Sequence, residues 1–126
     1  MEVKELIADL FGCDPKLIDD VVYLKATLSR LAAELGTHVV EAGSHKYHPQ
    51  GASVCVFVEE SHLLISTWPE HGIAVFNCLL THGPDPNDSL ERLKEALGAK
   101  SINVNRFVRK WETYNHSATA DITTIK

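Results

Sequence analysis

Four short apolar runs between residues 38 and 80 constrain the fold more than any other feature of the sequence. They are His38–Ala42, Ser53–Glu59, His62–Trp68 and Ile73–Leu79, and the HPQG and PEHG segments beside them are typical turn sequences. Parallel neighbouring strands need a crossover of a dozen or more residues, so connections this short predict an antiparallel sheet.

Two amphipathic helices and two further strands flank this block. Asp14 can cap the first helix, Pro15 suits its first position and Gly36 ends it, while leucine and valine side chains form one apolar stripe along it. The other predicted elements are a strand over Val3–Leu10, a helix over 87–97 and a strand over Ile102–Val108. The layered arrangement that covers such a sheet is an α/β fold of the α+β type, a two-layer sandwich with both helices on one face. The other face would be partly apolar, which favours pairing with a second copy.

Length and composition exclude several classes of protein. The 126 residues predict one domain over 1–126, and the net charge of −5 without a basic stripe argues against binding nucleic acid or an anionic membrane. No apolar stretch is long enough to span a bilayer, and the first residues do not read as a signal peptide. Three widely spaced cysteines without a CxxC pair favour reduced thiols in a cytoplasm.

One connection in the strand block breaks the expected pattern. Two apolar strands meet at Glu59-Glu60-Ser61-His62, where there is no glycine, asparagine or proline to make a tight turn. Composition alone favours a solvated hairpin tip at this place. A second interpretation is that the turn is strained because it has a chemical role.

The surrounding motifs support the second interpretation. The run Glu60-Ser61-His62-Leu63, followed by Thr67-Trp68-Pro69-Glu70-His71-Gly72, resembles the signature of the short prokaryotic S-adenosylmethionine decarboxylases. Further matches cover about residues 3 to 110: Leu10-Phe11-Gly12-Cys13-Asp14, His45-Lys46-Tyr47, Gly51-Ala52-Ser53 and Asp85-Pro86.

This resemblance implies a self-cleaving proenzyme with a pyruvoyl cofactor. The Ser61 hydroxyl would attack the carbonyl of Glu60, and cleavage between these residues would give chains 1–60 and 61–126. The pyruvoyl group made from Ser61 would form a Schiff base with the substrate amine and accept the electrons left by loss of CO₂, with no metal and no pyridoxal phosphate. The resemblance also implies a homodimer whose active sites draw on both copies, acting on a small molecule of polyamine biosynthesis.

Several site residues follow from the resemblance. Ser53 matches a serine that helps processing, and Glu70 matches the acid that holds the ribose hydroxyls of the substrate. Tyr47 stands where the family usually has a phenylalanine that stacks on adenine, and Trp68 belongs to the same substrate site.

Two positions depart from the family pattern. Ser66 stands where the family has a histidine needed for processing. At the cysteine that reprotonates the product carbon, an ungapped alignment places Thr81 and a shift of one residue places His82. A threonine hydroxyl is a weak acid, whereas a histidine with a pKa near ~6.5 is a plausible donor.

The sequence therefore leaves alternatives open. The protein is expected to decarboxylate S-adenosylmethionine, or L-ornithine or L-arginine as a diverged member, or to be a non-catalytic regulatory homologue. A zinc site from His45 and His48 with His62 or His71 is a further alternative, although no cysteine or acid completes a tetrahedral set at a recognisable spacing.

Overall fold

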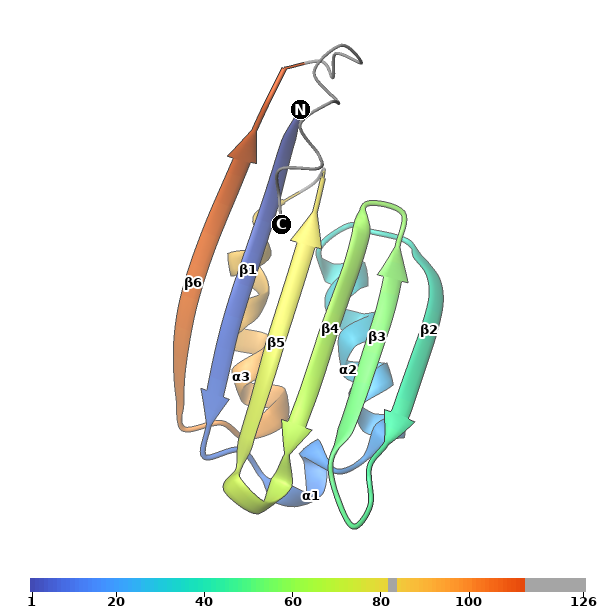
Figure 1. Ribbon diagram of the computed structural model, residues 1–126, viewed down its shortest axis with the longest axis vertical. Coiled ribbons are helices and arrows are strands. Elements are labelled where there is room, and N and C mark those ends of the chain that lie inside the picture. The colour runs from blue at the N-terminus through green and yellow to red at the C-terminus, as the bar shows by residue number, and fades with distance from the viewer. Residues whose placement is uncertain (82–83, 113–126) are drawn as a thin grey trace, which may run out of the picture.

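A six-stranded, fully antiparallel sheet forms one layer of the computed structural model, which describes residues 1–81 and 84–112. The strands lie in the order β2-β3-β4-β5-β1-β6, so β2 and β6 are its edges. The helices cover a single face of this sheet (Figure 1). The predicted two-layer α+β sandwich is confirmed. The strands and helices are β1 (Glu2–Phe11), α1 (Pro15–Ile18), α2 (Val21–Glu34), β2 (Val39–Lys46), β3 (Ala52–Val58), β4 (Ser61–Trp68), β5 (Ile73–Leu80), α3 (Leu90–Leu97) and β6 (Ser101–Lys110).

Alternation along the central strands supplies the core. In β3, β4 and β5 every second side chain is buried against the helices, and the ones between them face the uncovered side of the sheet. Fully buried side chains such as Phe76, Ile65 and Leu28 join the sheet to α2. These strands therefore have one face packed in the core and one open face.

The first predicted helix is wrong in one respect, because the chain forms two helices there. Asp14 caps α1 through the Lys16 N–H (2.9 Å), and α1 ends at Ile18. Asp20 then caps α2 through the Tyr23 N–H (3.0 Å), which starts a new helix. The break leaves Asp19 between the two helices, where its carboxylate is available to other parts of the chain.

The second predicted helix and the first edge strand also differ in extent. A 3₁₀ helix over Pro86–Ser89 precedes α3, and Asp85 caps it through the Asn87 N–H. Strand β2 runs to Lys46 rather than ending at Ala42, because its pairing with β3 continues as far as Lys46↔Ala52. Nearly all of β2 is exposed, so it lacks the alternation that reveals a half-buried strand.

No helix in the described part of the chain is long and apolar enough to cross a membrane.

Candidate active site

The β3–β4 hairpin holds Ser61 in an unusual backbone conformation. Ser61 has φ of 147°, and it is the only non-glycine residue with positive φ in the part of the chain that the structure describes. Such a conformation is rare for a residue with a side chain and stores strain of about 1–3 kcal/mol. The strained torsion is about the N–Cα bond of Ser61, directly next to the peptide bond between Glu60 and Ser61.

Thr81, the residue after β5, holds the carbonyl of that peptide bond. Its backbone N–H and its Oγ1 hydroxyl both donate to the Glu60 oxygen, at 3.0 and 3.1 Å. This contact exists because β4 pairs with β5 from Ser61↔Leu80 onward, which places residue 81 beside the hairpin. Two donors on one carbonyl oxygen polarise the carbonyl and can stabilise negative charge that develops there.

Two further side chains complete this end of the sheet. The Ser61 Oγ lies 3.1 Å from Nδ1 of His62. Glu60 Oε1 is buried and has no hydrogen-bond partner among the described residues. We call Glu60, Ser61, His62 and Thr81 the hairpin cluster. It combines a nucleophile, a polarised carbonyl and two groups that can accept a proton.

A second polar cluster lies at the other end of β4. Ser53 and Ser66 face each other across β3 and β4, and their hydroxyl oxygens are 2.7 Å apart. The Tyr47 hydroxyl continues the chain of hydrogen bonds to Ser53 at 3.1 Å. We call Tyr47, Ser53 and Ser66 the hydroxyl cluster.

A pocket of about 370 Å³ opens beside the hydroxyl cluster. Two half-exposed aromatic side chains, Tyr47 and Trp68, and the carboxylate of Glu70 line it. Among the described residues, no lysine, arginine or histidine lines this pocket. Aromatic faces and a carboxylate favour a ligand that carries a flat ring or a positive charge. The structure thus brings together Tyr47, Ser53, Ser66, Trp68 and Glu70.

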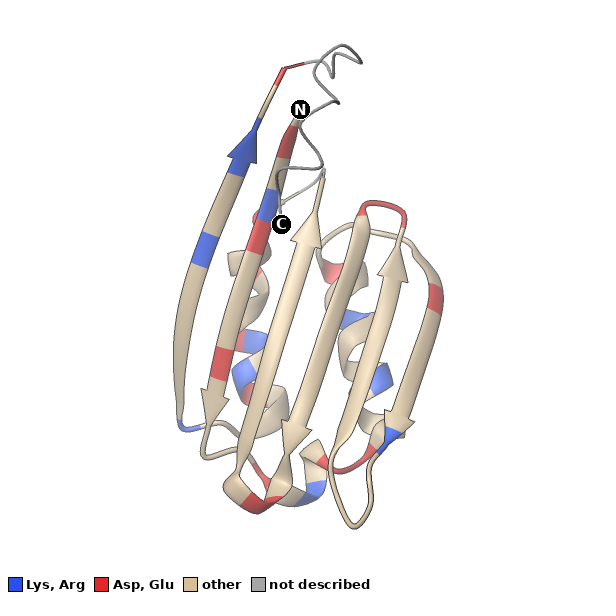
Figure 2. Ribbon diagram, viewed as in Figure 1, with Lys and Arg blue, Asp and Glu red and all other residues tan. Residues whose placement is uncertain are grey.

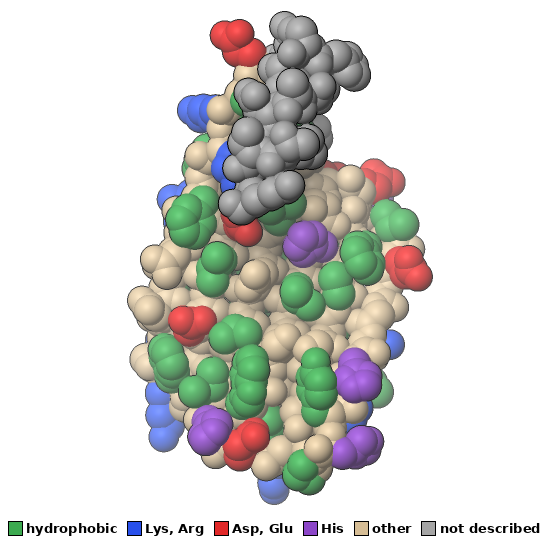
Figure 3. All heavy atoms as spheres, viewed as in Figure 1, with side chains coloured by type: hydrophobic (Ala, Val, Ile, Leu, Met, Phe, Trp, Pro, Cys, Tyr) green, Lys and Arg blue, Asp and Glu red, His purple; other side chains and the backbone are tan. Residues whose placement is uncertain are grey.

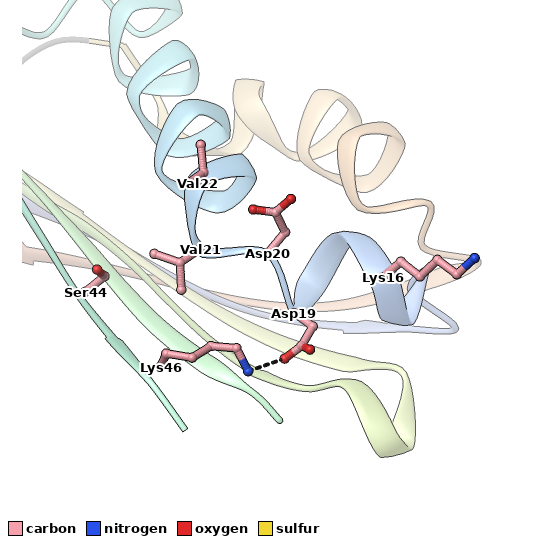
Figure 4. Close-up of a pocket in the computed structure, with 7 residues that line it drawn as sticks. All are labelled: Lys16, Asp19, Asp20, Val21, Val22, Ser44 and Lys46. Carbon is pink, nitrogen blue, oxygen red and sulfur yellow. Dashed lines mark hydrogen bonds and ion pairs between the residues drawn. The ribbon is translucent and has the colours of Figure 1, made fainter. Parts of the chain in front are cut away.

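The loop that carries Tyr47 is held by a charged clamp from the helix layer. Figure 4 shows the Lys46 side chain reaching Asp19, and both residues line a larger, open pocket of about 640 Å³. The Lys46 Nζ donates to Asp19 Oδ1 at 2.7 Å and to the Tyr47 carbonyl at 3.1 Å, and the Gly51 N–H also donates to Asp19 Oδ1, at 2.8 Å. The hydrogen bond from Lys46, followed by that from Gly51, lowers the pKa of the Asp19 carboxyl. The clamp fixes both ends of the turn between Tyr47 and Gly51.

None of the three cysteines belongs to the hairpin cluster or to the hydroxyl cluster. Cys78 is fully buried in the core, and burial raises its pKa to about 12. Burial also raises the pKa of Cys13 and of Cys55, and all three cysteines are unpaired. Within residues 1–81 and 84–112, no three His, Cys, Asp or Glu side chains converge as metal ligands, so the zinc arrangement considered from the sequence does not form there.

The two clusters are too far apart to meet within one chain. Ser61 and Ser66 are five residues apart on β4, which separates them by about 17 Å at roughly 3.3 Å per residue. The open face of the sheet runs between them. Figure 2 shows that β3, β4 and β5 carry no Lys, Arg, Asp or Glu, and Figure 3 shows hydrophobic side chains spread over this face. Phe57 and Phe107 on the same face are nearly half exposed.

Sequence reasoning did not find every residue of these sites. His62 was considered only as a zinc ligand, and Asp19 and Lys46 were not assigned to a site at all. The adjacent acids Asp19 and Asp20 inside the predicted helix were the sequence signal for a break there. Asp20 caps the second helix, and Asp19 binds Lys46 instead. His82 lies outside the described residues, so its alternative role remains a prediction.

Comparison with known proteins points to one family. The family model described as S-adenosylmethionine decarboxylase matches residues 4–110. A protein of Clostridium botulinum named "S-adenosylmethionine decarboxylase proenzyme" is 37% identical over 107 residues, covering 82% of this chain and 90% of that protein. A protein of the same name from Thermotoga petrophila is 38% identical over 103 residues, covering 80% of this chain and 78% of that protein. The crystal structure of the adenosylmethionine decarboxylase from Aquifex aeolicus VF5 superposes with a TM-score of 0.77 at 25% identity, covering 90% of this chain and 95% of that one.

Proposed function

Because the chain belongs to the S-adenosylmethionine decarboxylase family, we propose that it cuts its own backbone between Glu60 and Ser61 and then removes CO₂ from S-adenosylmethionine. The observation that carries this proposal is the geometry on the two sides of that peptide bond. Ser61 is strained, and Thr81 holds the Glu60 carbonyl with two hydrogen bonds. The activity is that of a decarboxylase made from a proenzyme.

The cleavage starts with the Ser61 hydroxyl as nucleophile. Once it has lost its proton, Oγ attacks the Glu60 carbonyl carbon, and the two Thr81 donors stabilise the oxyanion that forms. The peptide C–N bond then breaks and leaves an ester on Oγ. Loss of the Ser61 Cα proton breaks the Cβ–Oγ bond and releases residues 1–60 with a free carboxylate. Water converts the remaining dehydroalanine into a pyruvoyl group and ammonia.

The residues around Ser61 suit such a group. When present, a pyruvoyl group supplies an electrophilic ketone for the substrate amine and accepts the electron pair that loss of CO₂ leaves behind. The Thr81 N–H and hydroxyl, which hold the Glu60 carbonyl oxygen in this structure, would be placed to donate to an oxygen of such a group. Thr81 or His82 would return a proton to the product carbon.

The substrate would bind at the pocket beside the hydroxyl cluster. The Tyr47 and Trp68 rings offer faces for adenine, and the Glu70 carboxylate can accept hydrogen bonds from ribose hydroxyls. No cationic side chain of the described part of the chain lines this pocket, which also suits the positive charge of a sulfonium. No observation favours L-ornithine, L-arginine or a purely regulatory role over this substrate.

A complete active site would need two copies of the chain. The pocket lies about 17 Å from Ser61 along β4. A second copy that packs its open face on the first about a two-fold axis, with the strands running in opposite senses, brings its pocket to the first copy's hairpin cluster. The uncharged central strands and the exposed Phe57 and Phe107 support this face as the interface. The unpaired thiols support the expected location in a reducing cytoplasm.

Intact-mass spectrometry tests the cleavage. Purified protein should give fragments 1–60 and 61–126, with the second lighter by one ammonia molecule than a fragment that begins with serine. The Ser61→Ala variant should stay uncut. A wild-type chain that stays uncut after prolonged incubation would favour the regulatory homologue.

A radiolabelled CO₂ release assay tests the substrate. Carboxyl-labelled S-adenosylmethionine, L-ornithine and L-arginine are supplied in parallel to the cleaved protein, and release is expected from S-adenosylmethionine. Release from L-ornithine or L-arginine alone would assign the diverged activity instead.

Complementation tests the shared site. Ser61→Ala and Glu70→Ala copies, each inactive alone, should regain partial activity when they are co-expressed, because one site of a mixed dimer keeps both residues. Mixed dimers that form but stay inactive would place both residues of each site in one chain.

A further inference from the structure

We infer that His62 is the general base that takes the hydroxyl proton of Ser61 in the first step of self-cleavage. The inference rests on the proposed self-cleavage and deepens it by assigning a catalytic residue. Ser66, at the position where the resemblance implies a histidine for processing, carries only a hydroxyl. A serine hydroxyl is not a base at neutral pH, so the proton acceptor has to be another group.

The geometry at Ser61 provides such a group. Neighbouring residues of a regular strand point to opposite faces of the sheet, so their side chains do not normally meet. At Ser61 the positive φ breaks this regularity, and Oγ lies 3.1 Å from His62 Nδ1. That distance is within the reach needed for proton transfer, and neutral imidazole with its proton on Nε2 accepts a hydrogen bond at Nδ1.

Carboxylates around His62 favour a base that becomes positively charged, although its direct partners across β3 and β5, Phe57 and Leu79, are apolar. Glu59 and Glu60 lie in the hairpin, and Glu41 on β2 and Glu5 on β1, which pairs with Arg109, lie in the same row across the sheet. The other titratable groups nearby on the described elements are the Cys55 thiol on β3 and His38, whose carbonyl accepts from the Glu59 N–H. Neutral imidazole is the commonest general base in proteins, because one ring nitrogen can accept a proton while the other keeps its own.

Every bond and every proton in this step is accounted for. The O–H bond of Ser61 breaks and its proton moves to His62 Nδ1, while Oγ bonds to the Glu60 carbonyl carbon. The carbonyl electron pair becomes the oxyanion held by Thr81. When the peptide C–N bond breaks, the imidazolium returns the proton to the departing nitrogen, which becomes the free amine of Ser61. No other reactant is needed.

Glu60 is the competing candidate, because its Oε1 is buried without a partner in the described part of the chain. The experiment therefore compares His62→Ala, His62→Asn and Glu60→Gln with the wild type. Each chain is made by cell-free synthesis, and the fraction cut is followed on denaturing gels between pH 5.5 and 8.5. His71→Ala serves as a matched control, because His71 lies in the 3₁₀ helix Pro69–His71 that follows the far end of β4.

We expect both His62 variants to be cut about 10²–10³-fold more slowly than the wild type. The wild-type rate should fall in a single step as the pH is lowered, because only neutral imidazole accepts the proton, and this pH step should vanish in His62→Ala. Added imidazole should restore part of the rate in His62→Ala, which a purely structural role of His62 does not predict. His71→Ala should keep both the rate and the pH step, Glu60→Gln should keep the pH step, and circular dichroism should show folded chains throughout.

The contrary results are distinct. A cleaving wild type with His62→Ala equally fast and an unchanged pH profile overturns this inference alone. Loss of cleavage in Glu60→Gln with full cleavage in His62→Ala assigns the base to Glu60. Slow cleavage in both His62 variants without rescue by imidazole and with the pH step retained shows a structural role and also overturns it. A wild-type chain that is never cut overturns the proposed function together with the inference.

Discussion

Replacing Thr81 by valine removes one of the two hydrogen bonds on the Glu60 carbonyl and changes little else. Valine has the shape of threonine and suits an extended chain. The Oγ1 donor at 3.1 Å is lost, while the backbone N–H donor at 3.0 Å stays. The substitution therefore isolates the contribution of one hydroxyl to the stabilisation of developing negative charge.

The magnitude follows from how oxyanion donors act. Removal of one such donor typically slows a reaction by about 10²–10³-fold, or about 2.7–4 kcal/mol of activation free energy. The remaining N–H keeps part of the stabilisation, so we expect a decrease of about 100-fold in the rate of self-cleavage for Thr81→Val. Thr81→Ser keeps the hydroxyl and should stay within about threefold of the wild type.

The rate is measured from the appearance of fragments 1–60 and 61–126 on denaturing gels after cell-free synthesis. Thermal unfolding of the uncut chains, compared on a Ser61→Ala background, checks that both variants are folded. Equal cleavage rates in Thr81→Val and the wild type would refute the idea that the Thr81 hydroxyl stabilises the oxyanion. A folded Thr81→Ser chain that is as slow as Thr81→Val would refute it as well.

Three other substitutions test the clamp and the core. Asp19→Asn should weaken the hold on the Tyr47 loop, which raises KM for the substrate several-fold with little change in kcat, as steady-state assays of cleaved protein can show. Because the Asp19 pKa is lowered in the folded state, its stabilising effect is present above pH ~3.9 and is lost as pH falls through the folded pKa; unfolding of Asp19→Asn and wild type should therefore converge in acid and differ at neutral pH. Gly51→Ala should destabilise the chain by about 1–3 kcal/mol in denaturant unfolding, since φ at this position is +101° and a Cβ would lie 2.9 Å from the Thr67 carbonyl. Phe76→Ala should lower the free energy of unfolding by about 3–5 kcal/mol, because this ring is fully buried in the core.

Local sequence patterns were enough to predict most of the fold. The alternation in β3, β4 and β5, together with short connections, led to an antiparallel sheet, and two apolar stripes led to a helical layer on one face. Details that depend on side-chain capping were predicted less well. The apolar stripe runs through the α1–α2 boundary without interruption and predicts one helix. The structure has two, because the backbone of Asp20 is extended and its side chain accepts from the Tyr23 N–H to start α2.

In the candidate site, too, some residues could be predicted from the sequence and others could be found only in the structure. Motifs such as Glu60-Ser61-His62-Leu63 are contiguous in the chain and therefore lead to the family and to the nucleophile without any structure. Contiguous motifs could not identify the hydrogen-bond partner of the Glu60 carbonyl. The two possible alignments left open whether Thr81 or His82 stands at the position of the family cysteine. The hydrogen-bonded register of β4 against β5 places Thr81 beside that carbonyl.

The sequence by itself thus determined the strands, the helical face, the family and the serine that is expected to react, because each of these is set by residues close together in the chain. The tertiary structure decided which groups surround that serine and which do not. Residues 60 and 81 meet because a whole strand pairing, stabilised by the core beneath it, fixes their distance. The same pairing keeps Ser61 and Ser66 at opposite ends of one rigid strand, although only five positions separate them. An extended strand advances about 3.3 Å per residue, so neighbours in the sequence become distant in space while residues on adjacent strands become partners.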